Sequence, residues 1–365
     1  MAPRESKSQP QQSKTVLVSE LKELLIRACC RYQWMMVDDF WQYLAAVTDS
    51  PLTRNHVGKV VSSLAGGSDE TPGQYLFKFA LPKTTSGAAP RVFVPGTASR
   101  ELFRRQGEED WFVWNKPDTM KRYSYSFMFH NLTATRLAIG AALHLRSHND
   151  YYLAETLMSS DMLRRPPRLS PSAQDAPRTL IPDLWLHIIA GDGTEYPLWI
   201  EVDRGSESRS AFQRLFRTRL LYCKSEQYKE YFGTRHVRLC YAITSSKPPH
   251  EDGRVNAILL WADEVLEKEK LHALAPFIHV TTINYETLYD DMSRLFTESI
   301  WYQPNKNAVM LLSPITTQET LHEKDSDPAG QQTGHPSAQN ASDHEDSGNA
   351  CQNLPPCETP PGFPV

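Results

Sequence analysis

Apolar residues recur at helical spacing in three successive stretches near the start of the chain. Residues 15–32 combine an apolar face with charged positions on the other side, and a second periodic stretch covers residues 37–47. A third begins after Asp49-Ser50-Pro51, because a capping side chain followed by proline starts helices efficiently. It ends at Gly66-Gly67, since glycine tolerates the left-handed backbone that closes a helix. The pattern therefore predicts three helices in a row.

Two short β-type runs follow, at residues 75–81 and 91–95, with a polar loop between them. The order helix, helix, helix, strand, loop, strand is typical of a winged helix-turn-helix, whose third helix enters the major groove of DNA. Polar and basic residues on the third helix and the loop are of the types that contact bases and phosphates. The same face could instead be a solvated surface, or the module could dock a protein. The candidate DNA-binding residues are Thr53, Arg54, Asn55, His56, Lys59 and Lys83.

The second half of the chain predicts a different kind of domain. Two apolar runs flank Gly191-Asp192-Gly193, and Asp-Gly favours the tight turn of a β-hairpin. A helix and a strand are expected before this hairpin, and a helix and a strand after it, which gives the order αβββαβ. The expected elements are a helix at 132–145, strands at 151–161, 184–190, 198–202 and 238–244, and a helix at 210–231. A further helix at 259–271, a strand at 280–284 and a helix at 285–301 are expected beyond them.

Three carboxylates lie beside the apolar runs of the hairpin. Asp183 precedes the first strand, while Glu201 and Asp203 are two apart in the second and so share one face of the sheet. Acids beside buried strands are costly unless a cation meets them. One interpretation is a cluster neutralised by nearby arginines, Arg204, Arg209 and Arg214. The other is a divalent-metal site, because magnesium prefers such hard oxygen ligands.

Length and charge set the domain organisation. A chain of 365 residues has room for two modest domains and a tail. The last 51 residues, from position 315, carry eight acids and one lysine, which leaves the rest of the chain slightly basic although the whole has a net charge of −4. That balance is compatible with nucleic acid binding but does not demand it. The predicted parts are a disordered arm (1–14), a winged helix-turn-helix (15–110), a linker (111–129), a second domain with the order αβββαβ (130–310) and a disordered acidic tail (311–365).

Composition also indicates the cellular location of the protein and the character of the linker. No run of 18 apolar residues and no apolar leader is present, so a cytoplasmic protein without membrane contact is expected. Six cysteines fit no zinc or disulfide framework and predict free thiols. The linker is rich in aromatic and basic residues. Its rings are expected to pack between the two domains, the alternative being that they stack on nucleic acid bases.

Three stretches carry a family resemblance: His130-Asn131-Leu132, PDLWLHI at 182–188 and EVDRGSES at 201–208. Together with the predicted winged helix, they resemble the bacterial replication-relaxation family over about residues 15–300. The resemblance implies an α/β chain (α+β overall) in which a winged helix-turn-helix precedes a PD-(D/E)xK, restriction-endonuclease-like domain. It implies a role in the replication or relaxation of plasmids and other mobile DNA.

The resemblance also assigns roles within the PD-(D/E)xK motif. Asp183 and Glu201 match the acids that hold Mg²⁺ or Mn²⁺, but Asp203 stands where the fold has its catalytic lysine. An aspartate cannot stabilise the developing phosphorane charge as a lysine does, so Asp203 is assigned instead as a third metal ligand. The cation would then come from Arg204 or Lys224 (or from Arg214). His130 could be a general base or a helix cap.

We therefore expect a protein that binds double-stranded DNA, as a monomer or a homodimer, with a second domain that either nicks DNA with magnesium or binds without cutting. Loss of the lysine favours binding without cutting. The alternatives are a transcriptional or copy-number regulator whose second domain serves oligomerisation, and a protein adaptor with no DNA contact.

Overall fold

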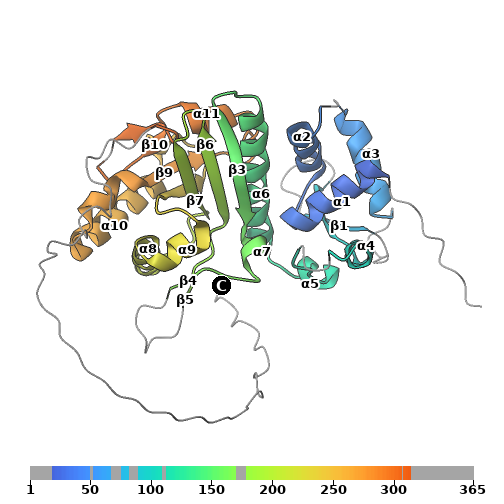
Figure 1. Ribbon diagram of the computed structural model, residues 1–365, viewed down its shortest axis with the longest axis horizontal. Coiled ribbons are helices and arrows are strands. Elements are labelled where there is room, and N and C mark those ends of the chain that lie inside the picture. Colours follow the sequence, from blue (N-terminus) through green and yellow to red (C-terminus); the bar gives the residue numbers. More distant parts are fainter. Residues whose placement is uncertain are drawn as a thin grey trace, which may run out of the picture. The chain divides into compact units, whose positions relative to one another are not determined.

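The computed structural model describes residues 19–49, 52–66, 75–81, 89–108, 112–169, 178–305 and 307–313. The predictions for the arm at residues 1–14, for Lys83 and for the tail beyond residue 313 lie outside this part, as do Ser50, Pro51 and Gly67 at the predicted ends of the third helix. Within it the chain is a mixed α/β structure, with helices packed around a mixed β-sheet (Figure 1). No helix in these ranges combines the length and the apolar character needed to cross a membrane.

The N-terminal part contains the predicted three helices and two strands. The third helix begins later than predicted, because Thr53 accepts a hydrogen bond from His56 N and caps it. Asp49 pairs instead with Arg146, far along the chain. The elements are α1 (Glu20–Tyr32), α2 (Val37–Val47), α3 (Arg54–Leu64), the antiparallel pair β1 (Leu76–Ala80) and β2 (Arg91–Pro95), and α4 (Thr97–Arg105).

About half of the stretch predicted as a linker is helical. It contains α5 (Pro117–Lys121) and the start of α6 (Tyr125–Arg146), a 22-residue helix that Ser124 caps by accepting a hydrogen bond of 3.2 Å from Phe127 N. The domain boundary expected at residue 130 therefore falls inside α6.

Seven strands form one sheet in the order β11-β10-β9-β8-β7-β6-β3. The strands β3, β6 and β7 make an antiparallel meander, and β7, β8 and β9 run parallel to one another. Beyond them β10 pairs antiparallel with β9, and β11 pairs antiparallel with β10. With α6 in front and a helical segment between β7 and β8, the order αβββαβ is as predicted. The strands are β3 (Tyr151–Met158), β6 (Leu184–Ala190), β7 (Glu195–Asp203), β8 (Arg238–Thr244), β9 (Ile278–Ile283), β10 (Trp301–Tyr302) and β11 (Ala308–Val309).

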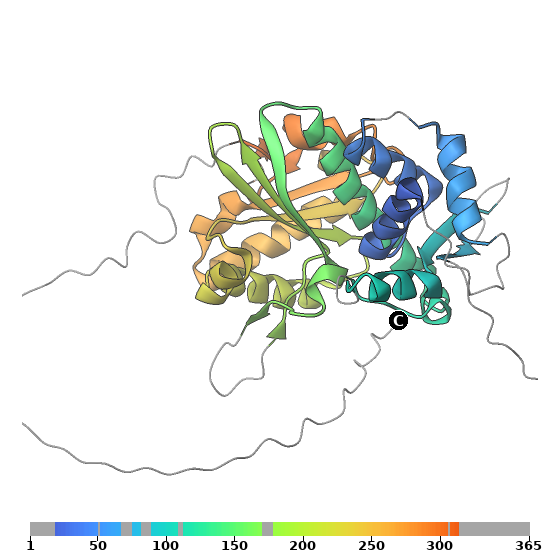
Figure 2. The ribbon, with the colours of Figure 1, turned by 45° about the vertical axis from the view of Figure 1, so that its right-hand side comes forward.

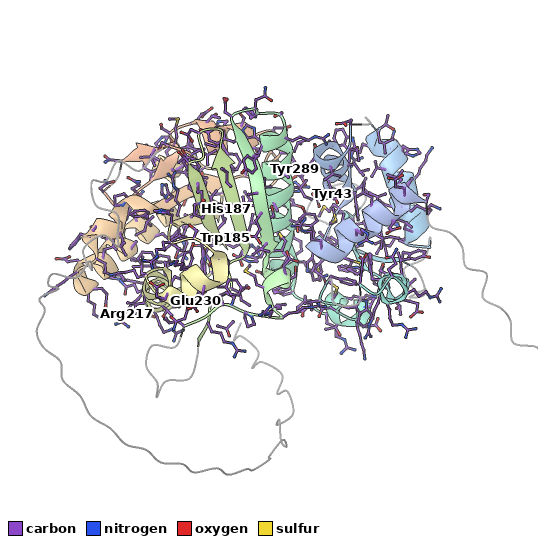
Figure 3. All side chains as sticks on the ribbon, in the orientation of Figure 1. Tyr43, Trp185, His187, Arg217, Glu230 and Tyr289 are labelled. Atoms are coloured by element: carbon purple, nitrogen blue, oxygen red, sulfur yellow. The ribbon has the colours of Figure 1, made fainter. Side chains whose placement is uncertain are left out.

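Alternating side chains of β6 and β7 divide the core into two layers. Leu184 and Ile200 face α6, whereas Trp185 and Trp199 face α8 (Arg209–Cys223), α9 (Glu226–Phe232) and α10 (Gly253–Glu269). Trp185, labelled in Figure 3, stacks on Phe232 with ring centroids 4.1 Å apart. Figures 1 and 2 show α6 between the sheet and the N-terminal helices, with α8 and α10 on the opposite face.

Smaller elements complete the chain and correct three predictions. The helix expected at 210–231 is broken, because Ser225 caps a new helix, α9, by accepting from Tyr228 N. The helix expected at 285–301 is only α11 (Met292–Thr297), and the tail expected from 311 begins later, since Leu311 and Leu312 are buried. The remaining elements are α7 (Ser159–Met162), β4 (Arg168–Leu169) paired with β5 (Arg178–Thr179), η1 (Pro249–Glu251) and η2 (His272–Phe277).

A buried ion pair joins the N-terminal helices to α6. Asp39 of α2 is fully buried, and its Oδ1 accepts hydrogen bonds from Arg136 Nε at 3.1 Å and from the Tyr289 hydroxyl at 2.9 Å. Arg136 also donates to the Tyr285 carbonyl at 2.7 Å and lies over the Tyr285 ring. The two predicted domains therefore share a polar contact as well as the continuous apolar core that α2 and α6 bury.

Candidate functional site

The carboxylates predicted from the sequence lie where β6 begins and β7 ends. Leu184 pairs with Ile200 across the antiparallel strands, so Asp183 and Glu201 occupy neighbouring positions at this edge. The edge also holds the carboxyl ends of the parallel strands β7, β8 and β9, the side of an α/β sheet where ligands usually bind. The hairpin that fixes this register is the one predicted, with Gly193 at a φ of +86°.

Asp183 accepts two hydrogen bonds from the protein. Its Oδ1 lies 2.9 Å from His130 Nε2 on α6, and its Oδ2 accepts from the backbone N–H of Val202 at 2.8 Å. Because the carboxylate can only accept, the histidine nitrogen is the donor in this contact. His130 thus holds the carboxylate, and it lies inside α6, whose cap is Ser124, and not at the helix start.

Burial works to lower the pKa of His130, but the charge of Asp183, the hydrogen bond to it and the charge of Glu201 together raise the pKa above the ordinary value of 6.5. The imidazole is therefore biased toward its cationic form beside the two acids.

Glu201 is paired with an arginine that the motif did not assign. Its Oε2 lies 2.8 Å from Arg219 NH2 of α8, and its Oε1 accepts from Trp199 Nε1 at 2.6 Å. Burial raises the pKa of Glu201 to about 7 against the attraction of Arg219, and the negative charge of Asp183 adds to the rise. Burial would lower the pKa of Arg219, but Glu201 and Tyr241 hold it above its usual range.

Asp203 points to a second arginine. Its Oδ2 accepts from Arg254 Nε of α10 at 2.7 Å, and its Oδ1 accepts from Gly205 N at 2.6 Å. The same guanidinium donates to the Glu207 carbonyl at 2.9 Å and lies over the Trp261 ring. Asp203 therefore ties the end of β7 to α10.

The cations proposed from the sequence lie elsewhere. Arg204 donates to the carbonyl and hydroxyl of Ser126 at the start of α6, and its guanidinium stands 5.1 Å above the Phe129 ring. Lys224 follows the end of α8, about one and a half turns beyond Arg219, and no hydrogen bond or ion pair joins it to the three acids. Arg209 pairs with Glu264 and Arg214 is exposed. The arginines that meet the acids are thus Arg219 and Arg254.

Donors of the protein already contact the three acids, Asp183, Glu201 and Asp203. Each of their six carboxylate oxygens already accepts a hydrogen bond or ion pair from the protein, and a cationic or cation-biased side chain faces every one of the three acids. A carboxylate oxygen has more than one lone pair, so a metal at these acids would compete with the charges of Arg219 and Arg254 rather than with every hydrogen bond. Within the described ranges, no three His, Cys, Asp or Glu side chains are grouped in a way that could hold a metal ion.

The candidate DNA-binding residues of the third helix are exposed together. Thr53, Arg54, Asn55, His56 and Lys59 lie on the solvent side of α3, while Val57 and Val61 on the opposite side are buried. Arg54 pairs with Asp38 of α2, which directs its guanidinium along the surface.

Comparison of the chain with family models, with curated proteins and with solved structures finds no match.

Proposed function

We propose that the chain is a DNA-binding protein of plasmid or mobile-element replication or relaxation. In this proposal the N-terminal part is a winged helix-turn-helix that contacts duplex DNA through α3. The second domain has a PD-(D/E)xK-like fold and binds without cutting. The observation that carries the proposal is the meeting of Asp183 and Glu201 at one sheet edge within the order αβββαβ.

The exposed face of α3 supports the DNA contact. Asn55 and Lys59 are exposed and share no hydrogen bond or ion pair with another described side chain, so both are free to reach a base edge or a phosphate. The antiparallel pair β1–β2 supports the assignment of a wing, since it is joined to the helices by a bridge between Met35, between α1 and α2, and Phe93 of β2.

In this proposal the second domain does not cut DNA because its acids are already paired with cationic side chains. A nuclease of this class needs two carboxylates open to a metal and a free cation beside the scissile phosphate. Here Arg219 pairs with Glu201 and His130 holds Asp183. Arg254 pairs with Asp203, the residue that stands where the motif has its lysine. The three contacts stabilise the sheet edge in a metal-free form.

Lys59→Ala is expected to weaken binding of duplex DNA and to reduce the slope of log Kd against log salt by about one, the loss of one phosphate contact. The measurement is fluorescence anisotropy of the full chain with a labelled duplex over a range of salt concentrations. Lys229→Ala removes an exposed lysine from α9 and should leave both quantities unchanged. Equal effects of the two substitutions, or no salt-dependent binding at all, would contradict the role of α3.

Added Mg²⁺ or Mn²⁺ is expected to leave supercoiled plasmid intact, and chelation with EDTA is expected to leave the duplex affinity unchanged at matched ionic strength. Gel electrophoresis of the plasmid and the anisotropy assay check the two outcomes. Metal-dependent nicking by the wild-type chain that Asp183→Ala and Glu201→Ala both abolish would refute the proposal of a non-cutting domain. Nicking that persists in both variants would identify a contaminating nuclease.

A further inference from the structure

Three aromatic rings stand exposed where α5 leads into α6. Tyr123 and Tyr125 are each 37 % exposed and Phe127 is 42 % exposed, although rings of this size are usually withdrawn from water. They alternate along five residues, and α5 just before them adds basic side chains. We call this set the aromatic–basic surface: Tyr123, Tyr125, Phe127, Lys116, Lys121 and Arg122.

The rings are held in place by their neighbours. Tyr123 and Phe127 are stacked, with centroids 4.4 Å apart and planes 24° from parallel. The buried Trp34 meets both of them edge-on, at 5.8 Å and 6.2 Å. A ring pair fixed in this way needs little further ordering to receive a third flat group on its outer side, which is a form of preorganisation.

The charges around the rings are mostly positive. Lys116, Lys121 and Arg122 are exposed, and none of them has an ion pair or side-chain hydrogen bond to another described residue. Asp118 is the one acid between positions 116 and 127. A flexible polyanion with flat groups along it would match both the rings and the charges.

We propose that the aromatic–basic surface binds single-stranded DNA, with bases stacked on Tyr123 and Phe127 and phosphates near Lys121 and Arg122. Single-strand binding proteins combine the same two elements, aromatic platforms and a positively charged track. Duplex DNA hides its base faces and would not use the rings. The inference takes from the proposed function only that the polymer is DNA, and it assigns a second surface distinct from α3.

The surface adjoins the candidate site through two residues. Arg204, directly after Asp203, donates to Ser126 between the exposed rings, and His130 follows Phe127 by about one helical turn. A strand bound on the rings would therefore run beside the His130–Asp183 contact. That places single-stranded DNA next to the sheet edge where the acids meet.

Phe127→Leu and Tyr123→Leu test the inference, because leucine keeps apolar volume but removes the flat ring. Each is expected to weaken binding of a labelled oligo-dT to the full chain about tenfold, the loss of one stacking contact. Phe127→Tyr keeps the ring and should retain wild-type affinity. Tyr152→Leu replaces a ring that is 55 % exposed on β3 and should change nothing.

Two outcomes would overturn the inference: unchanged oligo-dT affinity in both Leu variants with unchanged thermal midpoints, or an equal loss in Tyr152→Leu. Tighter binding of a matched oligo-U RNA would overturn the assignment to DNA. Measuring duplex affinity in the same variants separates this surface from α3. Lys59→Ala should weaken duplex binding alone and Phe127→Leu single-strand binding alone, so either proposal can fail while the other stands.

Discussion

Replacing Arg136 with methionine is expected to lower the free energy of unfolding by about 3–5 kcal/mol, the typical cost of removing one partner from a buried ion pair. The substitution leaves the fully buried Asp39 without its cation and also removes the bond to the Tyr285 carbonyl. Burial already raises the pKa of Asp39, so the unpaired carboxylate would be strongly unfavourable. Chemical denaturation monitored by circular dichroism measures the loss.

Two controls make this result specific. In the double variant Asp39→Asn with Arg136→Met, no charge remains buried at this contact, and much of the stability should return. Arg209→Met breaks a surface pair, in which Arg209 is 58 % and Glu264 30 % exposed, and should cost less than about 1 kcal/mol. A loss of under about 1 kcal/mol in Arg136→Met itself would show that the contact between α2 and α6 does not depend on this pair.

Glu201→Gln is expected to remove a pH dependence of stability from the protein. The pKa of Glu201 is raised from 4.5 to about 7 in the folded chain, so between these values the folded state binds more protons than the unfolded state. The contribution of Glu201 to the unfolding free energy is therefore fully present below pH 4.5 and is lost as the pH rises to about 7. The unfolding free energy of the glutamine variant, relative to wild type, should rise by about 2–3 kcal/mol from about pH 4.5 to about pH 8.

The difference between the two proteins cancels the groups that do not interact with Glu201. His130 is not among them: its pKa is raised in part by the charge of Glu201, so its own contribution, present below pH 6.5 and lost as the pH rises further, becomes smaller in the glutamine variant. Denaturation curves at several pH values supply the measurement. A difference that stays flat with pH would mean that Arg219 keeps Glu201 ionised throughout.

Local signals in the sequence were sufficient for most of the fold. The Asp192-Gly193 turn, the alternation of Leu184 and Trp185 and the apolar strand of β8 each depend on neighbouring residues, and these signals predict the β6–β7 hairpin and β8, whereas β10 and β11 were not predicted. The start of α6 was missed for a physical reason. Tyr125 and Phe127 are exposed, so the apolar periodicity that marks a buried helix face is absent there, and only Ser124 indicates the cap.

The sequence predicts the acids of the candidate site but not the arginines that pair with them. Asp183 and Glu201 follow from the motif and the hairpin, and His130 from the resemblance. Arg254 lies 51 positions from Asp203 and reaches it only because α10 packs beside α8 against the sheet. No spacing rule encodes a contact of that range. Arg214, Lys224 and Arg219 are all basic residues on or at the end of α8, and only helix packing decides which of them faces Glu201.

The length of α6 determines how this chain can be divided for experiments. The helix buries Arg136 against Asp39 and Leu137 in the core that it shares with β6 and β7, and Ser126 near its start receives Arg204. A cut at residue 130, where the sequence pattern changes, would split the helix and leave apolar surface on both fragments. A fragment that carries the sheet alone should therefore keep residues 124–147 intact, and an isolated N-terminal fragment would need a substitute for the α6 surface that covers α2.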